Sequence, residues 1–367
     1  MKHNWEYRRL GDIAPAKPFK GTITSSNDKY WCLNLDKVES NTGVVLEYDY
    51  IEESELGGSV HKFAVDNVLF SKLRPNLNKV VVPEQNGYCT TELVPLHPLD
   101  ILNRYYLAYY LRSPKYVNFL IGKTGGAKMP RVKMDIFWNS TIPLPPMEKQ
   151  EQIVAELDQI NDLIAKNHEL LSQLDSLAQS LFYDTFGDPI ANPKGWNTAR
   201  IKDCCSHLYA GGDKPKDTTV ERTVDNQIPI FSNGVENKGL YGYTSIPRST
   251  APSITISGRG TIGVPFIRST PFFPIIRLIV ATPDPSIIDI QYLYFVFISL
   301  NLGGKGAAIP QLTVPMVKDI NIPLPPLSLQ EDFAAKVEAI EAQKVKVEAE
   351  IAELQTLLDA RMDYWFN

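Results

Sequence analysis

Two stretches of the chain carry hydrophobic residues at alternating steps of four and three, the pattern of a helix that packs along another helix. The first stretch begins at Ile153 and the second at Phe333, and polar residues interrupt them at Asn167 and Lys344. Since one chain holds two such helices, we expect them to pair with each other as an antiparallel coiled coil. The expected seam residues are Ile153, Leu157, Ile160, Ile164, Leu171 and Leu174, and Val337, Ile340, Val347, Ile351, Leu354 and Leu358.

A repeated sequence precedes each predicted helix. The stretch that begins at Ile142 reads Ile-Pro-Leu-Pro-Pro and continues to a Gln-Glu pair, and it recurs 180 residues later from Ile322. A second pair of matching segments begins at Trp5 and at Trp196, 191 residues apart. Self-similarity at a nearly fixed offset indicates that one structural unit is used twice. The larger second offset predicts that the first globular block is longer and that the blocks differ most in their interiors.

Short runs of β-branched residues bounded by Gly, Pro and Asn predict strands inside each block. The runs are 67–72, 79–82, 253–257 and 275–280, and helical patterns follow at 104–111 and 291–300. We therefore expect α+β blocks, each with a curved, mostly antiparallel sheet and each followed by a long helix. The expected boundaries are 1–145 for the first block, 146–187 for its helix, 188–326 for the second block and 327–367 for the second helix.

Proline and serine residues predict how the long helices begin. The Pro-Leu-Pro-Pro stretches favour extended backbone, so each helix should start directly after them. In the second copy, Ser328 and Glu331 have the spacing of an N-terminal capping box.

The formal net charge of −5 hides an uneven distribution. Blocks 1–145 and 191–326 carry +3 and +4, whereas segments 146–190 and 327–367, which hold the predicted helices, carry −7 and −5. Mildly basic blocks suit a polyanionic partner such as nucleic acid. The acidity of the helices is also explained by glutamate being a good helix former.

Composition limits the cellular compartments in which the chain is expected and the metal or cofactor sites it is expected to hold. No run of about 18 apolar residues exists and residues 1–5 are not apolar, so we expect neither a membrane span nor a signal peptide. Cys32, Cys89, Cys204 and Cys205 lack paired CxxC spacing and are expected to be reduced thiols in the cytoplasm. The histidines are scattered as well, so we predict no metal site and no cofactor bound by this chain.

One glycine-rich segment matches the spacing of a dinucleotide site. This segment, residues 258–263, reads Gly-Arg-Gly-Thr-Ile-Gly. A dinucleotide site needs a helix directly afterwards, and Pro265, Pro271 and Pro274 prevent one. We expect a turn that presents Arg259 instead.

No segment carries a convincing catalytic motif. Glu236-Asn-Lys238 with Asp225 upstream loosely resembles a metal-dependent nuclease core, but matches this short are frequent by chance. An Asn/Asp-Pro-Pro-Tyr/Phe methyltransferase motif is missing, and no Ser/His/Asp or Cys/His arrangement is recognisable. We therefore expect a chain that is not an enzyme.

Basic and amide side chains in the blocks are candidates for nucleic-acid contacts. Lys and Arg near Gly suit phosphates, and Asn, Gln and Arg suit base edges. The candidates are Lys72, Arg74, Asn76, Lys79, Lys123, Lys128, Arg131 and Lys133 in the first block and Lys214, Lys216, Asn233, Arg248, Arg259, Lys305 and Gln311 in the second.

Taken together, these segments resemble the specificity (S) subunit of type I restriction-modification systems. The resemblance covers nearly the whole chain, and the duplicated order is more specific than any one motif. The segments that carry it are the Trp-x-x-x-Arg-Leu/Ile block starts, the Ile-Pro-Leu-Pro-Pro stretches, and residues 69–76, 180–189 and 254–263.

The resemblance implies a non-catalytic ruler for DNA. Each block would be a target recognition domain that reads one half of a bipartite double-stranded site, and the helices would form a spacer that sets the gap. Two methyltransferase (M) subunits would bind around the spacer, and a translocating restriction (R) subunit could join. Because the chain is acidic overall, its affinity for DNA alone would be weak, with the methyltransferase subunits supplying part of the phosphate contact.

Two other function classes compete with this interpretation. A combined restriction and methyltransferase enzyme would need motifs that are missing. A coiled-coil scaffold that binds protein ligands would not need basic blocks on acidic helices.

Overall fold

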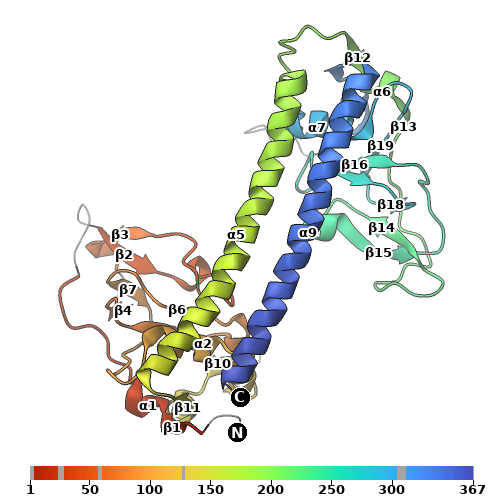
Figure 1. Cartoon of the computed structure of the whole chain (residues 1–367). Coiled ribbons are helices and arrows are strands. Elements are labelled where there is room, and N and C mark those ends of the chain that lie inside the picture. Colours follow the sequence, from red (N-terminus) through yellow and green to blue (C-terminus); the bar gives the residue numbers. More distant parts are fainter. Residues whose placement is uncertain (1–3, 24–28, 57–59, 126–128, 304–310, 367) are drawn as a thin grey trace. The chain divides into compact units, whose positions relative to one another are not determined.

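In this computed structural model of the chain, residues 4–23, 29–56, 60–125, 129–303 and 311–366 are described. The chain divides into two compact units: unit 1 holds residues 1–168 and 349–367, and unit 2 holds residues 169–348. Two long helices, α5 (Met147–Phe186) and α9 (Leu327–Phe366), contribute to both units (Figure 1). They are the two predicted heptad helices.

Unit 1 alternates short strands and helices ahead of α5. Its elements are β1 (Glu6–Arg9), α1 (Leu10–Ile13), β2 (Lys29–Leu33), η1 (Leu35–Lys37), β3 (Tyr50–Glu52), η2 (Glu53–Glu55), β4 (Val60–Phe63), β5 (Val68–Ser71), η3 (Pro75–Leu77), β6 (Val80–Val81), β7 (Gly87–Thr90), β8 (Leu93–Leu96), α2 (Arg104–Arg112), α3 (Pro114–Ile121), β9 (Thr124–Gly125), β10 (Arg131–Val132), α4 (Met134–Asn139) and β11 (Thr141–Leu144). The larger sheets have the strand orders β3-β2-β7-β4 and β6-β5-β8, and β1 pairs with β11. In the core the rings of Phe70 and Phe137 stack with centroids 4.4 Å apart.

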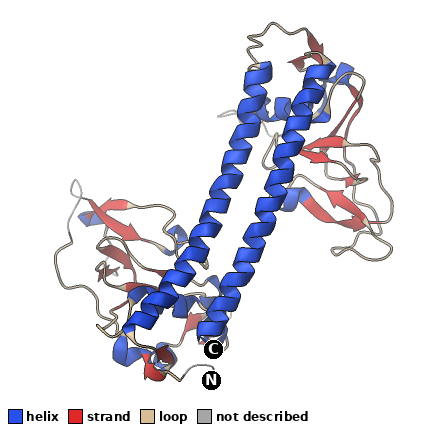
Figure 2. Cartoon of the chain, in the orientation of Figure 1, coloured by secondary structure: helices blue, strands red, loops and turns tan. Residues whose placement is uncertain are grey.

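Unit 2 repeats this plan with different strand lengths. Its elements are β12 (Thr198–Arg200), α6 (Ile201–Cys204), β13 (Cys205–Ala210), β14 (Ile228–Phe231), η4 (Glu236–Gly239), β15 (Leu240–Thr244), β16 (Ser253–Ile256), β17 (Pro265–Arg268), β18 (Phe273–Pro274), β19 (Ile279–Pro283), α7 (Ile290–Leu300), α8 (Val314–Lys318) and β20 (Asn321–Pro323). The sheets have the orders β13-β19-β16-β17 and β15-β14-β18, and β12 pairs with β20. Figure 2 shows the strands in red and the helices in blue. The α+β class of both blocks is confirmed.

A buried glutamine fixes the start of each long helix. Gln150 accepts a hydrogen bond from the Asn103 backbone N–H (2.8 Å) and donates to the carbonyls of Ile101 and Pro145 (2.9 Å each). Both glutamines are completely buried, where a polar group must find partners. Gln330 makes the corresponding bonds with the Asp289 N–H and the Pro325 carbonyl (2.9 Å each).

A buried tyrosine in each block bonds the last strand before the long helix, β11 in unit 1 and β20 in unit 2. The hydroxyl of Tyr106 on α2 donates to the Pro143 carbonyl, and that of Tyr292 on α7 donates to the Pro323 carbonyl, both at 2.8 Å. Burial raises the pKa of both phenols well above the ordinary value. The two repeats therefore share individual hydrogen bonds and not only an outline.

Within unit 1 the first half of α5 packs on the second half of α9. Glu156 pairs with Arg361, and Asn167 Nδ2 lies 3.5 Å from Glu350 Oε2. Positions that rise along α5 meet positions that fall along α9, so the helices run antiparallel here.

Unit 2 shows the same antiparallel order. Lys344 Nζ lies 2.8 Å from Asp175 Oδ1, and the rings of Phe182 and Phe333 meet with centroids 5.8 Å apart. The predicted antiparallel pairing is thus confirmed in each unit. All twelve predicted seam positions are buried or half-buried: Ile153, Leu157, Ile160, Val337, Val347 and Leu358 are buried, and Ile164, Leu171, Leu174, Ile340, Ile351 and Leu354 are half-buried.

Three local predictions are wrong. In the described residues the first block holds four small sheets and the second holds three, instead of one each, and the parallel pairs β2–β7 and β14–β18 were not predicted. The strand expected at 275–280 begins only at Ile279, because residues 275–278 form a turn that contains Ile276 and Arg277 at positive φ. Ser328 is no N-cap, because α9 already begins at Leu327.

Candidate nucleic-acid interface

In unit 1, a loop follows the central strand β5 and is held by the segment around β10. The backbone N–H of Val132 donates to the Lys72 carbonyl (2.9 Å), and that of Arg74 donates to the Pro130 carbonyl (2.8 Å). Arg74 is exposed and left-handed, with φ +48°. The structure therefore brings three predicted contact residues together, Lys72, Arg74 and Arg131.

Arg131 is positioned by an acidic neighbour. Its guanidinium lies 2.9 Å from Glu92 Oε1 and also donates from Nε to this carboxylate. The hydrogen bond and charge of Glu92 raise the pKa of Arg131, which is itself exposed. The pair holds the planar fork of the arginine in one direction, as base-edge recognition requires.

In unit 2, the equivalent loop follows the central strand β16. The backbone N–H of Leu312 donates to the Gly258 carbonyl (2.9 Å), as Val132 does to Lys72 in unit 1. The exposed guanidinium of Arg259 donates to Gln311 Oε1 at 3.2 and 3.4 Å. This loop leads directly into β17, so the predicted turn that presents Arg259 is confirmed.

A groove of about 380 Å³ lies beside this loop in unit 2. Arg259, Arg277 and Gln311 line it together with apolar residues of β19 and the segment before α8. Arg277 was missed from the sequence, because it stands in a hydrophobic run that has the pattern of a strand. No local signal separates it from a strand residue.

The remaining candidates lie on other parts of the two units. Lys79 is half-buried and donates to the Leu35 carbonyl (2.6 Å). The side-chain nitrogen and oxygen of Asn233 both form hydrogen bonds inside unit 2. Lys214 and Arg248 lie 6.0 and 5.4 Å from the ring centroids of Tyr241 and Tyr209. Asn76, Lys123, Lys133 and Lys216 are exposed, while Lys128 and Lys305 lie outside the described residues.

Two further arginines point into their own units: Arg268 is buried and Arg112 is half-buried. Arg268 donates to Thr255 Oγ1 (2.9 Å) and its Cζ lies 3.5 Å from the Phe231 ring centroid. Burial lowers the pKa of Arg268 to about 10, and it does the same for Arg112, whose guanidinium donates to the Val80 carbonyl. Both cations serve the packing of their own unit.

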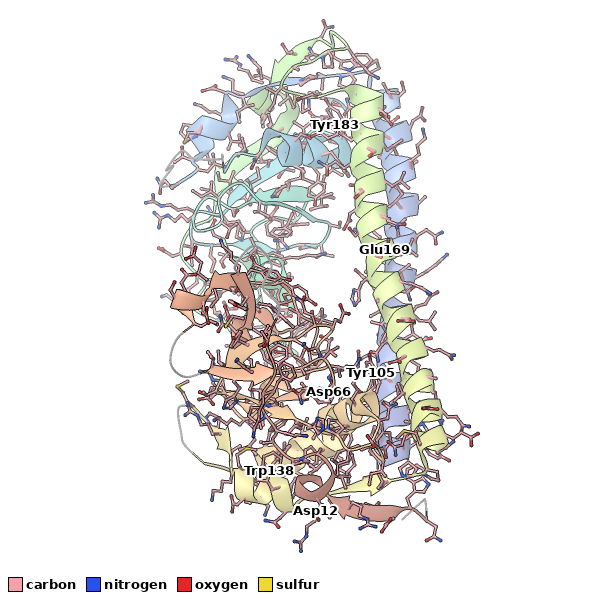
Figure 3. All side chains as sticks on the ribbon, turned by 90° about the vertical axis from the view of Figure 1, so that its left-hand side faces the viewer. Asp12, Asp66, Tyr105, Trp138, Glu169 and Tyr183 are labelled. Atoms are coloured by element: carbon pink, nitrogen blue, oxygen red, sulfur yellow. The ribbon has the colours of Figure 1, made fainter. Side chains whose placement is uncertain are left out.

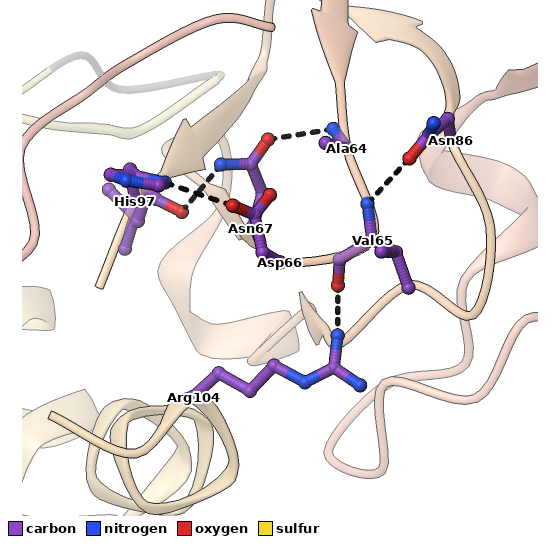
Figure 4. A network of polar contacts seen from close by, with 8 residues as sticks. Ala64, Val65, Asp66, Asn67, Asn86, His97 and Arg104 are labelled. Carbon is purple, nitrogen blue, oxygen red and sulfur yellow. Dashed lines mark hydrogen bonds and ion pairs between the residues drawn. The ribbon is translucent and has the colours of Figure 1, made fainter. Parts of the chain in front are cut away.

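A cluster of polar side chains surrounds the turn between β4 and β5. Asp66 and His97 form an ion pair at 3.4 Å, and Asn67 bonds Ala64 N and the Leu96 carbonyl (Figure 4). Arg104 donates to the Val65 carbonyl. These side chains close a turn, and no nucleophile faces them among the residues of the cluster.

Three features of the described residues bear on metal binding, cysteine chemistry and membrane spanning. Those residues contain no group of three or more His, Cys, Asp and Glu side chains that could hold a metal ion. All four cysteines are free, and burial raises the pKa of Cys205 to about 12. Over the same residues, no helix is both long and apolar enough to cross a membrane.

The long helices carry exposed side chains along their outer faces (Figure 3). Glu169 and Tyr183 on α5 are both exposed. Leu163, Leu170 and Leu177 recur every seven residues on α5 and are 50%, 40% and 53% exposed. This apolar stripe lies outside the seam that α9 covers.

Comparison with known proteins gives one consistent result. The family model for the type I restriction modification DNA specificity domain matches residues 2–176 and again residues 193–355. A type I specificity subunit of Mycoplasma pneumoniae is 27% identical over 246 residues, which is 65% of this chain and 64% of that subunit. The MjaIX specificity subunit of Methanocaldococcus jannaschii is 21% identical over 97% of this chain and 91% of its own length.

Solved structures agree in fold. The crystal structure of the S subunit of a type I restriction-modification system from M. genitalium superposes with a TM-score of 0.59 at 15% identity, covering 99% of this chain and 96% of that one. A chain from a study of complex assembly and conformational transition of the type I R-M system superposes with a TM-score of 0.61 at 20% identity, covering 98% and 96%.

Proposed function

The chain belongs to the type I restriction modification DNA specificity family, and from this premise we propose that it gives such a system its DNA sequence specificity. Unit 1 and unit 2 each read one half of a bipartite double-stranded site. The observation that carries the proposal is a frame that occurs in both units combined with loops that differ between them. The frame is the strand pair next to each long helix (β1–β11 or β12–β20) and the buried glutamine at the helix start. Gln150 and Gln330 share two corresponding bonds, one to a backbone N–H and one to a proline carbonyl. The exposed side chains at the strand ends differ, with Arg74 and Arg131 in one unit and Arg259 and Gln311 in the other.

A shared scaffold with different exposed side chains suits two readers of different sequences. Arginine and amide side chains recognise base edges by paired hydrogen bonds, and isolated lysines contact phosphates. Segments 1–145 and 188–326 are proposed as the target recognition domains, and segments 146–187 and 327–367 as the spacer helices.

The spacer helices dock two methyltransferase subunits, and a restriction subunit joins the complex through them. The support is the exposed stripe of Leu163, Leu170 and Leu177. An apolar row on a helix is removed from water when a partner helix packs on it. The net charges of −7 and −5 on the helix segments make them poor contacts for DNA and better contacts for protein.

The chain takes no catalytic step and binds no cofactor in this proposal. Its conspicuous polar clusters close turns or fix helix starts, as at Asp66–His97 and Gln150. Methyl transfer and cleavage then belong to the partner subunits.

The test is sequencing of methylated sites in cells that hold the cognate methyltransferase with or without this chain. We expect methylation at one bipartite sequence only when the chain is present. Exchange of residues 1–145 for the corresponding block of a relative should change one half-site and leave the other intact. Methylation that is independent of the chain, or a simultaneous change of both half-sites, would contradict the proposal.

A further inference from the structure

Residues 275–278 in unit 2 form an unusual turn at the edge of the groove beside Arg259. Ile276 and Arg277 both have positive φ, +52° and +59°. Left-handed backbone is unfavourable for any residue with a side chain and most of all for a β-branched one. Backbone in such a conformation persists only where the surroundings enforce it, and it concentrates at functional sites.

Several backbone contacts enforce this turn. The N–H of Ile276 donates to the Gly212 carbonyl (2.8 Å), and the N–H of Arg277 donates to the Gly211 carbonyl (3.0 Å). A Cβ on Gly211 would lie 2.7 Å from the Pro274 carbonyl group, so only glycine allows the two chains to approach this closely.

Asn233 links the turn to the strand-end loop. Its Nδ2 donates to the Ile276 carbonyl (2.6 Å), and its Oδ1 accepts from the Gly258 N–H (2.7 Å). Gly258 is itself packed against the turn, since a Cβ there would lie 3.2 Å from the Arg277 carbonyl. The positions of Arg277 and the Arg259 loop are therefore fixed relative to each other.

The side chains on this rigid turn are exposed. Ile276 is 47% exposed although it is a large apolar residue. Arg277 is exposed and lines the groove, and it forms no ion pair with any residue that the structure describes. Arg259 stands in a different setting, because its neighbour Gly260 has open space around it and φ +69°. The backbone that carries Arg277 is held by its bonds to Gly211, Gly212 and Asn233, and arginine side chains contact base edges as well as phosphates.

We propose that Arg277 is a base-reading residue of unit 2, with Ile276 as its apolar neighbour on the DNA and Asn233 as the positioning residue of the turn. Arg277 donates two hydrogen bonds to one base edge in the major groove, as arginine does with guanine. Ile276 packs on the adjacent base. The inference rests on the proposed function of the chain and adds the residue that selects one base pair of the second half-site.

The experiment uses the full chain assembled with its methyltransferase subunits and a pool of duplexes with a randomised central segment. Bound duplexes are selected and sequenced, and affinity for the selected site is measured over a range of salt concentrations. The wild-type complex should select a bipartite site. The Arg277→Ala complex should select the same first half-site and lose preference at one base pair of the second, by about 5- to 100-fold, with the salt dependence unchanged.

Further variants separate base reading from charge and from folding. Arg277→Lys keeps the charge but lacks the planar fork of the guanidinium, so the same preference should weaken. Asn233→Ala should weaken that preference with Arg277 still present. Arg222→Ala removes an exposed arginine outside the groove and should change nothing. Circular dichroism and thermal unfolding of each variant establish that it is folded.

Three outcomes would overturn the inference. A folded Arg277→Ala complex that selects the unchanged site shows that Arg277 reads no base. Uniformly weaker binding with a salt slope reduced by about one unit makes Arg277 a phosphate contact. If the wild-type complex selects no sequence at all, the proposed function fails and this inference with it.

Discussion

The two repeated units hold their helices in the same way but end their central strands differently. Gln150 and Gln330 occupy equivalent buried positions and bond equivalent backbone groups. After β5 the loop presents a left-handed Arg74, whereas after β16 it presents a glycine-flanked Arg259 beside a strained turn. The contrast shows which parts of a duplicated fold are constrained by packing and which are free to acquire different contacts.

The first prediction tests the long helices, which should set the distance between the half-sites and should not affect which bases are recognised. Insertion of seven residues into each of α5 and α9 preserves the heptad seam and lengthens the pair by about 10 Å. DNA advances about 3.4 Å per base pair, so we expect the gap between half-sites to grow by about three base pairs. The measurement is sequencing of sites methylated by the complex that holds the variant.

A control insertion tests the seam itself. Three residues added to one helix alone should disrupt the register and abolish recognition. An active seven-residue variant with an unchanged gap, or with changed half-site sequences, would show that the helices do not act as the spacer.

The second prediction concerns the aromatic ends of the two helices. Phe186 ends α5 beside Tyr292 (4.7 Å between ring centroids), and Phe366 ends α9 beside Tyr106 (5.4 Å). Truncation of a buried phenylalanine costs about 3–5 kcal/mol. Phe186 and Phe366 are both buried, so we expect Phe186→Ala and Phe366→Ala each to lower the free energy of unfolding by an amount in this range.

Urea unfolding monitored by circular dichroism measures both costs. Phe119→Ala removes a ring that is 39% exposed and should cost less than 1 kcal/mol. Equal small losses at all three positions would mean that the helix ends do not stabilise their units.

The third prediction concerns the buried glutamines. Gln150→Ala leaves three backbone groups without partners and Gln330→Ala leaves two. Each unsatisfied buried group costs about 1–3 kcal/mol, partly relieved by water. We expect losses of about 3 and about 2 kcal/mol, against almost none for the exposed Gln159→Ala. Hydrogen exchange at Asn103 and Asp289 reports each site separately, and unchanged protection there would contradict the shared-frame interpretation.

The frame was predictable from the sequence because its signals are local. The heptad positions, the Pro-Pro helix starts and the helices at 104–111 and 291–300 each depend on residues within a few turns of one another. Residues 275–280 show the limit of such signals. Their β-branched pattern indicates a strand, but bonds to Gly211, Gly212 and Asn233, far away in the chain, impose a turn on Ile276 and Arg277.

The sequence proposes the candidate contact residues only as a set, and where each one lies depends on the fold. Lys72, Arg74 and Arg131 come together because the loop after β5 pairs with the segment around β10, an arrangement that no spacing in the sequence reveals. Asn233 was selected for its amide, which the structure uses to connect two loops. Burial and pairing decide such roles, and both depend on tertiary structure.

The smallest expected effect is a pH dependence of stability that unit 1 should show and unit 2 should not. Glu156 on α5 pairs with Arg361 and accepts from Trp365 Nε1 (3.1 Å), and these bonds lower its pKa. The residue 180 positions later is Lys336, so unit 2 lacks this pair. A carboxylate with a lowered pKa in the folded state stabilises that state above its unfolded pKa, and the contribution is lost as pH falls through the folded pKa.

We therefore expect acidification below about pH 4.3 to weaken the helix pair of unit 1 by about 0.5 kcal/mol, the size of a partly exposed ion pair. The Glu156→Gln variant should be less stable than wild type at pH 7 and should approach it at pH 3. Glu151→Gln, an exposed change on the same helix, should show no such convergence. Urea midpoints at both pH values measure the difference. A Glu156→Gln variant that stays equally less stable at both pH values would show that packing of the side chain, and not its charge, holds α9 at this position.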